Sequence, residues 1–155
     1  MISGGLKIFQ RPLSLFSDGQ ITAESSTGAV TRCLDRNRVS YWRSSGSDDT
    51  TTETITITWA SAISFNRVLL VDHNFKGFNI KYDSGGSFVH FASVVGLDGS
   101  QTNITETSFA NDTAYYEVPT TTTTRLQIEV TTTQTADEEK YLNQVLVTTE
   151  LGTLV

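Results

Sequence analysis

The two histidines and the single cysteine are the first candidates for nucleophilic or metal chemistry in this chain of 155 residues. His73 lies between Asp72 and Asn74 at the end of an apolar run, and His90 lies in a later segment. Neighbouring residues on a strand point to opposite faces, so Asp72 and His73 are not expected to form a catalytic pair. Cys33 has no histidine placed to activate it, and the sequence contains neither a G-x-S-x-G motif nor a Gly-rich phosphate loop. The sequence therefore predicts a protein that is not an enzyme.

A second group of residues has the chemistry of carbohydrate recognition. Sugar rings stack their C–H faces on aromatic side chains, and their hydroxyls need polar partners nearby. The candidates, all expected at loop tips, are Tyr41, Arg43, His73, Asn74 and Phe75. Packing against a neighbouring subunit would use the same residues, so both a glycan ligand and a protein contact remain open at this point.

The charge balance argues against nucleic acid as a partner. The formal net charge is −6, from 17 acidic and 11 basic residues, and such a surface repels phosphate backbones. The densest basic cluster, formed by Arg32, Arg36, Arg38 and Arg43, is interrupted by Asp35 and is too small to predict a nucleic-acid site. No stretch approaches the roughly 20 apolar residues of a membrane span, so no membrane insertion is expected. A lone cysteine and the lack of a recognisable signal peptide fit folding in a reducing cytoplasm.

Alternating apolar and polar residues predict an all-β fold. The 25 threonines agree, because a β-branched side chain suits a strand and covers a wet sheet face without adding charge. The alternation is clearest at residues 52–60 and 125–130, which are expected to be strands. Further strands are expected at residues 20–25, 67–72, 78–83, 88–91, 114–118 and 144–149, and one or two helical turns at 136–142. The side chains predicted to point inward from two facing layers are Ile55, Ile57, Trp59, Leu126, Ile128 and Val130.

The order of these segments resembles the discoidin family, also called the factor 5/8 type C or galactose-binding-like domain. The resemblance is carried by ITAESS, LDRNRVSYWRSS, TITITWASAISFNRVLLVDHN, GFNIKYDSGGSF, RLQIEV and NQVLV, in that order. It implies a jelly-roll β-sandwich of about eight antiparallel strands over residues 20–149. Residues 1–19 would precede it as an arm or edge strand, and residues 150–155 would follow as an apolar tail.

The resemblance also implies a calcium site. In the family, the loop that here holds Asp35, Asn37 and Ser40 often wraps calcium, and a glutamate of the last strand completes the ligand set. Gln144 stands at that position in this chain, which removes one negative charge, and Arg36 replaces a glycine. The alternative is a loop held by hydrogen bonds from Asp35 and Ser40 to backbone amides. We favour the hydrogen-bonded loop, so no cofactor is required.

A narrower resemblance concerns function. The stretches YWRS, VLLVDHNFKGFNI and VTTELGTL are similar to small virion proteins of tailed phages that carry the same fold. This implies a non-enzymatic tail, fibre-associated, collar or capsid-decoration protein, made in the host cytoplasm and located in the virion. Its expected partners are other virion proteins and further copies of itself, with at least one of the two termini packed against a neighbouring protein. The alternative function is a lectin-like module that recognises glycans through its rim loops.

Overall fold

The computed structural model describes residues 6–9, 19–27, 29–34, 37, 39–46 and 48–154. Its regular elements are strands apart from one 3₁₀ helix, so the all-β prediction is confirmed. The elements are β1 (Leu6–Phe9), β2 (Gly19–Ala23), η1 (Val30–Leu34), β3 (Trp42–Arg43), β4 (Glu53–His73), β5 (Phe75–Ser84), β6 (Ser87–His90), β7 (Val94–Gly96), β8 (Gly99–Gln101), β9 (Thr105–Glu106), β10 (Thr113–Thr133), β11 (Tyr141–Thr148) and β12 (Glu150–Leu154). Within these described residues, no helix is long and apolar enough to cross a membrane.

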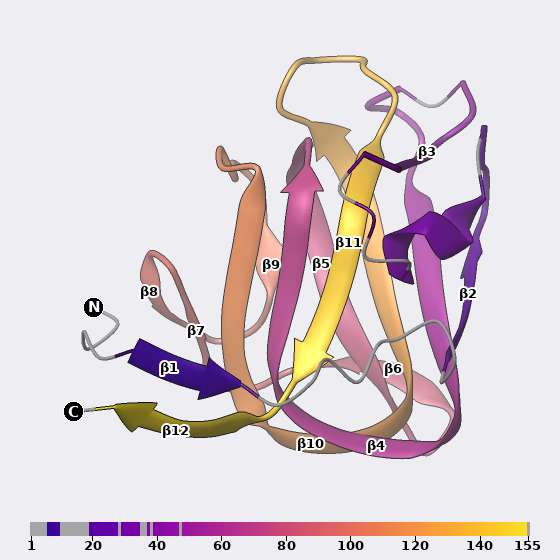
Figure 1. The fold of residues 1–155 in the computed structure, drawn as a ribbon. Coiled ribbons are helices and arrows are strands. Elements are labelled where there is room, and N and C mark those ends of the chain that lie inside the picture. Colours follow the sequence, from indigo (N-terminus) through magenta and orange to yellow (C-terminus); the bar gives the residue numbers. More distant parts are fainter. Residues whose placement is uncertain are drawn as a thin grey trace.

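Two long strands, β4 and β10, each belong to both layers of a β-sandwich (Figure 1). The first half of β4 pairs with β2 and with the second half of β10, which also pairs with β5. The second half of β4 pairs with β11 and with the first half of β10, which also pairs with β7. Between the halves the register shifts from Glu117 to Thr121 and again from Thr123 to Arg125. Pro119 lies in the first gap. Because the ladder is already interrupted there, the N–H that proline lacks is not needed for a hydrogen bond between the strands.

The sandwich core contains the inward-facing residues expected from the alternation. All six of the predicted side chains, from Ile55 to Val130, are 3% exposed or less. Each is worth about 1.5–3 kcal/mol of favourable transfer free energy when fully buried. The pattern of Thr54, Thr56 and Thr58 agrees with this arrangement, since these side chains are half-buried or exposed on the opposite face.

One end of the sandwich is closed by a buried lysine. The Lys140 side chain has no exposed surface, and its ammonium donates to the carbonyls of Asp48 (2.7 Å) and Thr51 (2.9 Å). Burial lowers the pKa of Lys140, and nearby carboxylates oppose that shift. Asp49 accepts hydrogen bonds from the backbone and side chain of Thr133, so the loops before β4 and after β10 are tied together. The helical turns predicted at 136–142 are wrong, because residues 134–140 form a loop that delivers Lys140 to these carbonyls.

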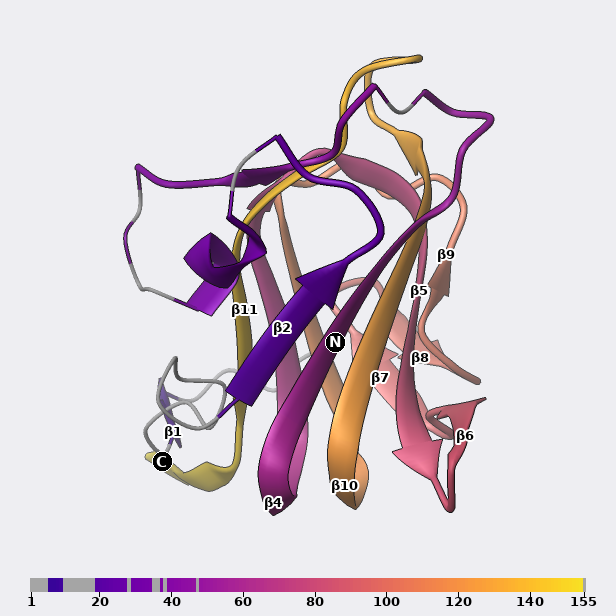
Figure 2. The ribbon, with the colours of Figure 1, turned by 90° about the vertical axis from the view of Figure 1, so that its right-hand side faces the viewer.

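The two ends of the described chain pair with each other. β1 and β12 form an antiparallel two-stranded ribbon, with Leu6 opposite Leu154 and Phe9 opposite Glu150. Figures 1 and 2 both show this ribbon beside the sandwich end at which β11 terminates. The ribbon shares no ladder with the ten-stranded sheet among the residues that the structure describes. A ribbon of two strands is marginally stable in water by itself, so additional packing is expected to stabilise it.

Candidate functional site

Strand β3 and the residue before it present two side chains on the surface, because Trp42 between them is anchored in the core. Trp42 is fully buried, and its indole N–H donates to the carbonyl of Ser25 (3.1 Å). Since side chains alternate across a strand, Tyr41 and Arg43 on either side of Trp42 turn outward. In the β3–β11 ladder, Arg43 is directly opposite Tyr141, the first residue of β11.

These three outward side chains form a compact group that we call the tyrosine–arginine cluster: Tyr41, Arg43 and Tyr141. The guanidinium carbon of Arg43 lies 5.1 Å from the ring centre of Tyr141 and 5.7 Å from that of Tyr41. The two rings meet edge to face, with their centres 5.6 Å apart. Cation–π contacts of this kind hold a guanidinium in place over aromatic faces. Tyr141 was not among the residues predicted from the sequence, where it fell in the supposed helix.

Hydrogen bonds fix both tyrosines of the cluster. The Tyr41 hydroxyl donates to Asp72 at 2.5 Å, and this bond raises the pKa of Tyr41 further than burial does. Burial, followed by the charge of Asp72, raises the pKa of Tyr141. The amide of Tyr141 donates to the side-chain oxygen of Asn74 (2.9 Å), whose own amide donates to the carbonyl of Glu139. Both phenols are therefore neutral hydrogen-bonding groups at physiological pH.

A polar hollow of about 740 Å³, which we call the 27–43 hollow, adjoins the cluster. Arg32 is fastened there by a hydrogen bond from its guanidinium to the carbonyl of Tyr41 (3.4 Å). Val39 is 83% exposed and adds an apolar surface. None of the described residues that line the hollow carries a carboxylate. The lining residues are Thr27, Arg32, Asn37, Val39, Ser40, Tyr41 and Arg43.

The structure separates the five residues predicted to contact a ligand into two sets. Tyr41 and Arg43 come together at the hollow, whereas His73 and Phe75 have no exposed surface and Asn74 is 4% exposed. His73, Asn74 and Phe75 are too buried to contact a ligand at the surface, and we do not retain them as contact residues. Asn74 instead positions the first residues of β11.

His73 is an interior residue. Its Nδ1 accepts the backbone N–H of Phe75 (3.0 Å), and its ring stacks on Phe109 with the ring centres 5.5 Å apart. Burial lowers the pKa of His73 to about 4, although the charges of Asp112 and Asp72 act in the opposite direction. The imidazole is therefore neutral at physiological pH and contributes to packing.

The loop predicted to hold calcium is held by an amide in its described part. The side-chain amide nitrogen of Asn143 donates to the carbonyls of Asn37 (3.0 Å) and Ser40 (2.6 Å). These carbonyls already accept N–H groups, so they do not fit a cation cradle in this conformation. Gln144, the ligand expected from β11, is 9% exposed, while Asp35 lies outside the described residues. In the described part of the chain no group of three or more His, Cys, Asp or Glu could hold a metal ion, and the calcium site stays an untested alternative to the hydrogen-bonded loop.

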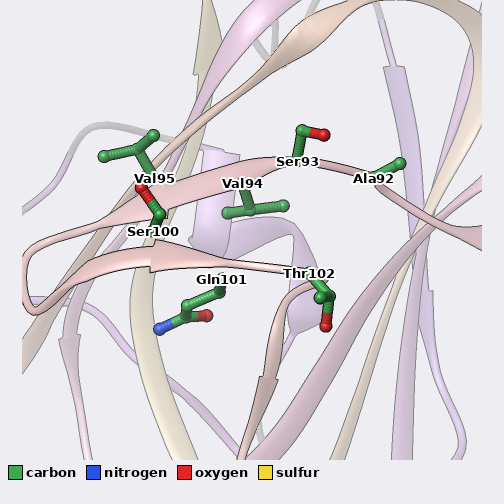
Figure 3. Close-up of a pocket in the computed structure, with 7 residues that line it drawn as sticks. All are labelled: Ala92, Ser93, Val94, Val95, Ser100, Gln101 and Thr102. Atoms are coloured by element: carbon green, nitrogen blue, oxygen red, sulfur yellow. The ribbon is translucent and has the colours of Figure 1, made fainter.

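A second hollow, of about 630 Å³, lies along the β7–β8 hairpin (Figure 3). Its lining comes from both strands of the hairpin and the residues beside them, and the described lining includes no aromatic or charged side chain. It therefore lacks the stacking and charged groups that fix the orientation of a sugar. The lining residues are Ala92, Ser93, Val94, Val95, Ser100, Gln101 and Thr102.

No family model matches the chain, and no curated protein matches it. Solved structures do. Chitosan-binding module 1, from a chitosanase/glucanase of Paenibacillus sp. IK-5, is 20% identical with a TM-score of 0.67, covering 89% of this chain and 98% of the module. Chitosan-binding module 2 of the same source, in complex with chitotriose, is 20% identical with a TM-score of 0.66, covering 87% and 98%.

A carbohydrate-binding module from Clostridium perfringens, in complex with GalNAc-β-1,3-galactose, is 11% identical with a TM-score of 0.65, covering 85% of this chain and 96% of the module. At these identities the likeness concerns the fold, and it agrees with the strand pairing described above. The chain therefore has the galactose-binding-like, or discoidin-like, β-sandwich fold.

Proposed function

We propose that this chain is a non-catalytic glycan-binding domain and that its ligand occupies the 27–43 hollow against Tyr41 and Arg43. The observation that carries the proposal is the hollow itself, which combines an aromatic ring, guanidinium groups and short polar side chains. Carbohydrate sites need this combination, because the ring faces stack while the hydroxyls exchange hydrogen bonds with water for hydrogen bonds with protein.

The chemistry of the hollow supports binding over catalysis. General acid–base chemistry needs a group that titrates near the operating pH within reach of the substrate. The described lining contains no histidine, cysteine or carboxylate, and the pKa of Tyr41 is raised, away from neutrality. These residues can hold and orient a ligand without transferring a proton at physiological pH.

The ligands of two solved structures with the same fold support the class of ligand. One was determined with chitotriose and the other with GalNAc-β-1,3-galactose. Both are carbohydrates, although they differ in their sugars. The structural alignments cover 85% and 87% of this chain. We therefore propose that the ligand of this chain is also a carbohydrate.

A glycan array tests the proposal. We expect the wild-type chain to bind a defined subset of glycans and the Tyr41→Ala variant to lose about fivefold or more in affinity for them, since stacking on an aromatic ring is worth about 1 kcal/mol beyond the area it buries. Arg125→Ala is the matched control, because Arg125 makes a cation–π contact of 5.0 Å with Phe88 elsewhere in the fold. Failure of the folded wild type to bind any glycan would overturn the proposal.

An assembly role in a virion is the second candidate function, and the β1–β12 ribbon is the observation that favours it. In the described part of the chain its two strands pair only with each other, outside the ten-stranded sheet, and strand edges of this kind pair readily with another chain. We propose that the ribbon mediates contacts with further copies or other virion proteins. Deleting residues 151–155 should then reduce the oligomer mass in light scattering while the circular-dichroism spectrum of the sandwich is kept. An unchanged mass would contradict this role.

A further inference from the structure

We propose that the glycan held in the 27–43 hollow is acidic, and that its carboxylate or sulfate group is bound by Arg32 and Arg43. This inference rests on the glycan-binding function proposed above and adds the chemical class of the ligand. The shared chemistry is an oxyanion attached to a sugar ring, whether the sugar is a uronic acid or a sulfated neutral sugar.

Among the described residues, Arg32 and Arg43 are two cations without a carboxylate partner that line one hollow. Residues 32–43 hold four of the 11 lysines and arginines in a chain whose net charge is −6. Three described cations elsewhere are neutralised by carboxylates: Arg67 by Glu117 (3.4 Å), Lys81 by Glu129 (2.5 Å) and Arg125 by Asp83 (3.1 Å). Arg32 and Arg43 make no ion pair with any residue that the structure describes. Two uncompensated guanidinium groups therefore face the same hollow.

The way each guanidinium is held leaves donors for a ligand. Arg43 is held over the rings of Tyr41 and Tyr141 by cation–π contacts, and its guanidinium makes no hydrogen bond to any residue that the structure describes. Its N–H donors, arranged in the fork that matches the two oxygens of a carboxylate or sulfate, therefore stay available to a ligand. Arg32 uses one terminal nitrogen on the carbonyl of Tyr41 and keeps its remaining donors. Both forks are thus oriented by contacts that would not have to break on binding.

The remaining lining suits the sugar that would carry the anion. Tyr41 and the exposed Val39 offer apolar surface to the C–H groups of a ring. The side chains of Thr27, Asn37 and Ser40 supply hydroxyl and amide groups around it. Because the described lining has no carboxylate, an acidic sugar meets no like charge there, whereas a cationic sugar would meet two guanidinium groups of its own sign.

Calorimetric titrations with matched pairs of polysaccharides test this inference. Polygalacturonate differs from highly methyl-esterified homogalacturonan only in its free carboxylates, and dextran sulfate differs from neutral dextran only in its sulfates. Chitosan supplies a cationic polymer. We expect the charged member of at least one pair to bind about tenfold or more tightly than its partner, with the first pair reporting carboxylate and the second sulfate. Chitosan should not bind, and raising the salt concentration should weaken binding of the acidic polymer.

Three variants locate the anion. Arg32→Ala and Arg43→Ala should each reduce affinity for the acidic polymer about tenfold or more, since each removes a charge-assisted hydrogen-bonding fork. Arg43→Lys should recover only part of the loss, because an ammonium keeps the charge but has neither the fork nor the flat face. Arg125→Ala changes the net charge by the same amount and should leave affinity within about twofold, because its charge lies outside the hollow.

The possible outcomes distinguish the acidic class of the ligand from the glycan-binding function on which this inference rests. Equal binding of charged and neutral polymers, lost in Tyr41→Ala but kept in Arg32→Ala and Arg43→Ala, would overturn the acidic class and leave the glycan-binding function standing. Tighter binding of the neutral polymers or of chitosan would also overturn the acidic class and leave the glycan-binding function standing. The absence of binding to every glycan tested would overturn both proposals. Thermal unfolding of each variant checks that a loss of affinity is not a loss of fold.

Discussion

Replacing His73 should change how the stability of the domain depends on pH. His73 has no exposed surface, and burial lowers its pKa to about 4 from the ordinary value of 6.5. The unfolded chain therefore takes up a proton on His73 near pH 6.5, whereas the folded chain takes it up only near pH 4. As pH falls through this window the unfolded state binds more protons, so the free energy of unfolding decreases.

The structure sets the size of this effect. A shift of one pKa unit corresponds to about 1.36 kcal/mol, so a displacement from 6.5 to about 4 removes about 3 kcal/mol of stability between about pH 7 and pH 4. The contribution of His73 to stability is fully present above pH 6.5. A total stability of about 5–15 kcal/mol is typical of single domains, so the loss is easily measured.

Urea unfolding at about pH 7, 6, 5 and 4, for the wild type and for His73→Asn, measures this contribution. Asparagine cannot titrate in this range, so the stability gap between the two proteins should narrow by about 3 kcal/mol as the pH falls. His90→Asn is the matched control, because it makes the same replacement at an exposed position of β6. Parallel curves for the wild type and His73→Asn would refute the reasoning.

Three further changes test other parts of the structure. Lys140→Met should lower the free energy of unfolding by about 3 kcal/mol in urea titrations, because two buried loop carbonyls lose their charged donor. Gly77→Ala should destabilise by about 1–3 kcal/mol, since the new Cβ would lie 2.5 and 2.6 Å from two threonine hydroxyls, and a shift in melting temperature reports it. Asn143→Asp should destabilise the domain by placing a carboxylate against the carbonyls of Asn37 and Ser40, and millimolar calcium should raise its melting temperature but not that of the wild type.

Local sequence patterns predicted where strands occur, but they did not predict that two of the strands continue for 21 residues each. The alternation around Ile57 and Ile128 correctly indicated one buried and one wet face, since the period of a strand is built into a few consecutive residues. The same patterns predicted separate strands at residues 52–60 and 67–72, although β4 runs through both. The threonine run after Pro119 likewise lies within β10 rather than between two strands. A strand that bends from one layer to the other breaks the alternation without ending the strand.

Half of the candidate site could be predicted, because only some of its residues are positioned by their neighbours in the sequence. Tyr41 and Arg43 flank a buried tryptophan, so their outward direction follows from the strand period. Tyr141 is placed beside them only by the β3–β11 register, which joins residues far apart in the sequence. His73 was expected at the rim because it ends an apolar run. Asp72 before it has a left-handed backbone (φ of 54°), so the alternation ceases to apply there.

The location of the ligand is tested most directly by amide chemical-shift mapping. A ¹⁵N-labelled chain would be titrated in turn with N-acetyllactosamine, chitotriose and trigalacturonate. We expect saturable shifts for at least one of these oligosaccharides, concentrated in residues 27–43 and at Tyr141, with the β7–β8 hairpin unaffected. Shifts confined to residues 92–102, or no saturable shift with any of the three, would contradict the assignment of the 27–43 hollow as a glycan-binding site.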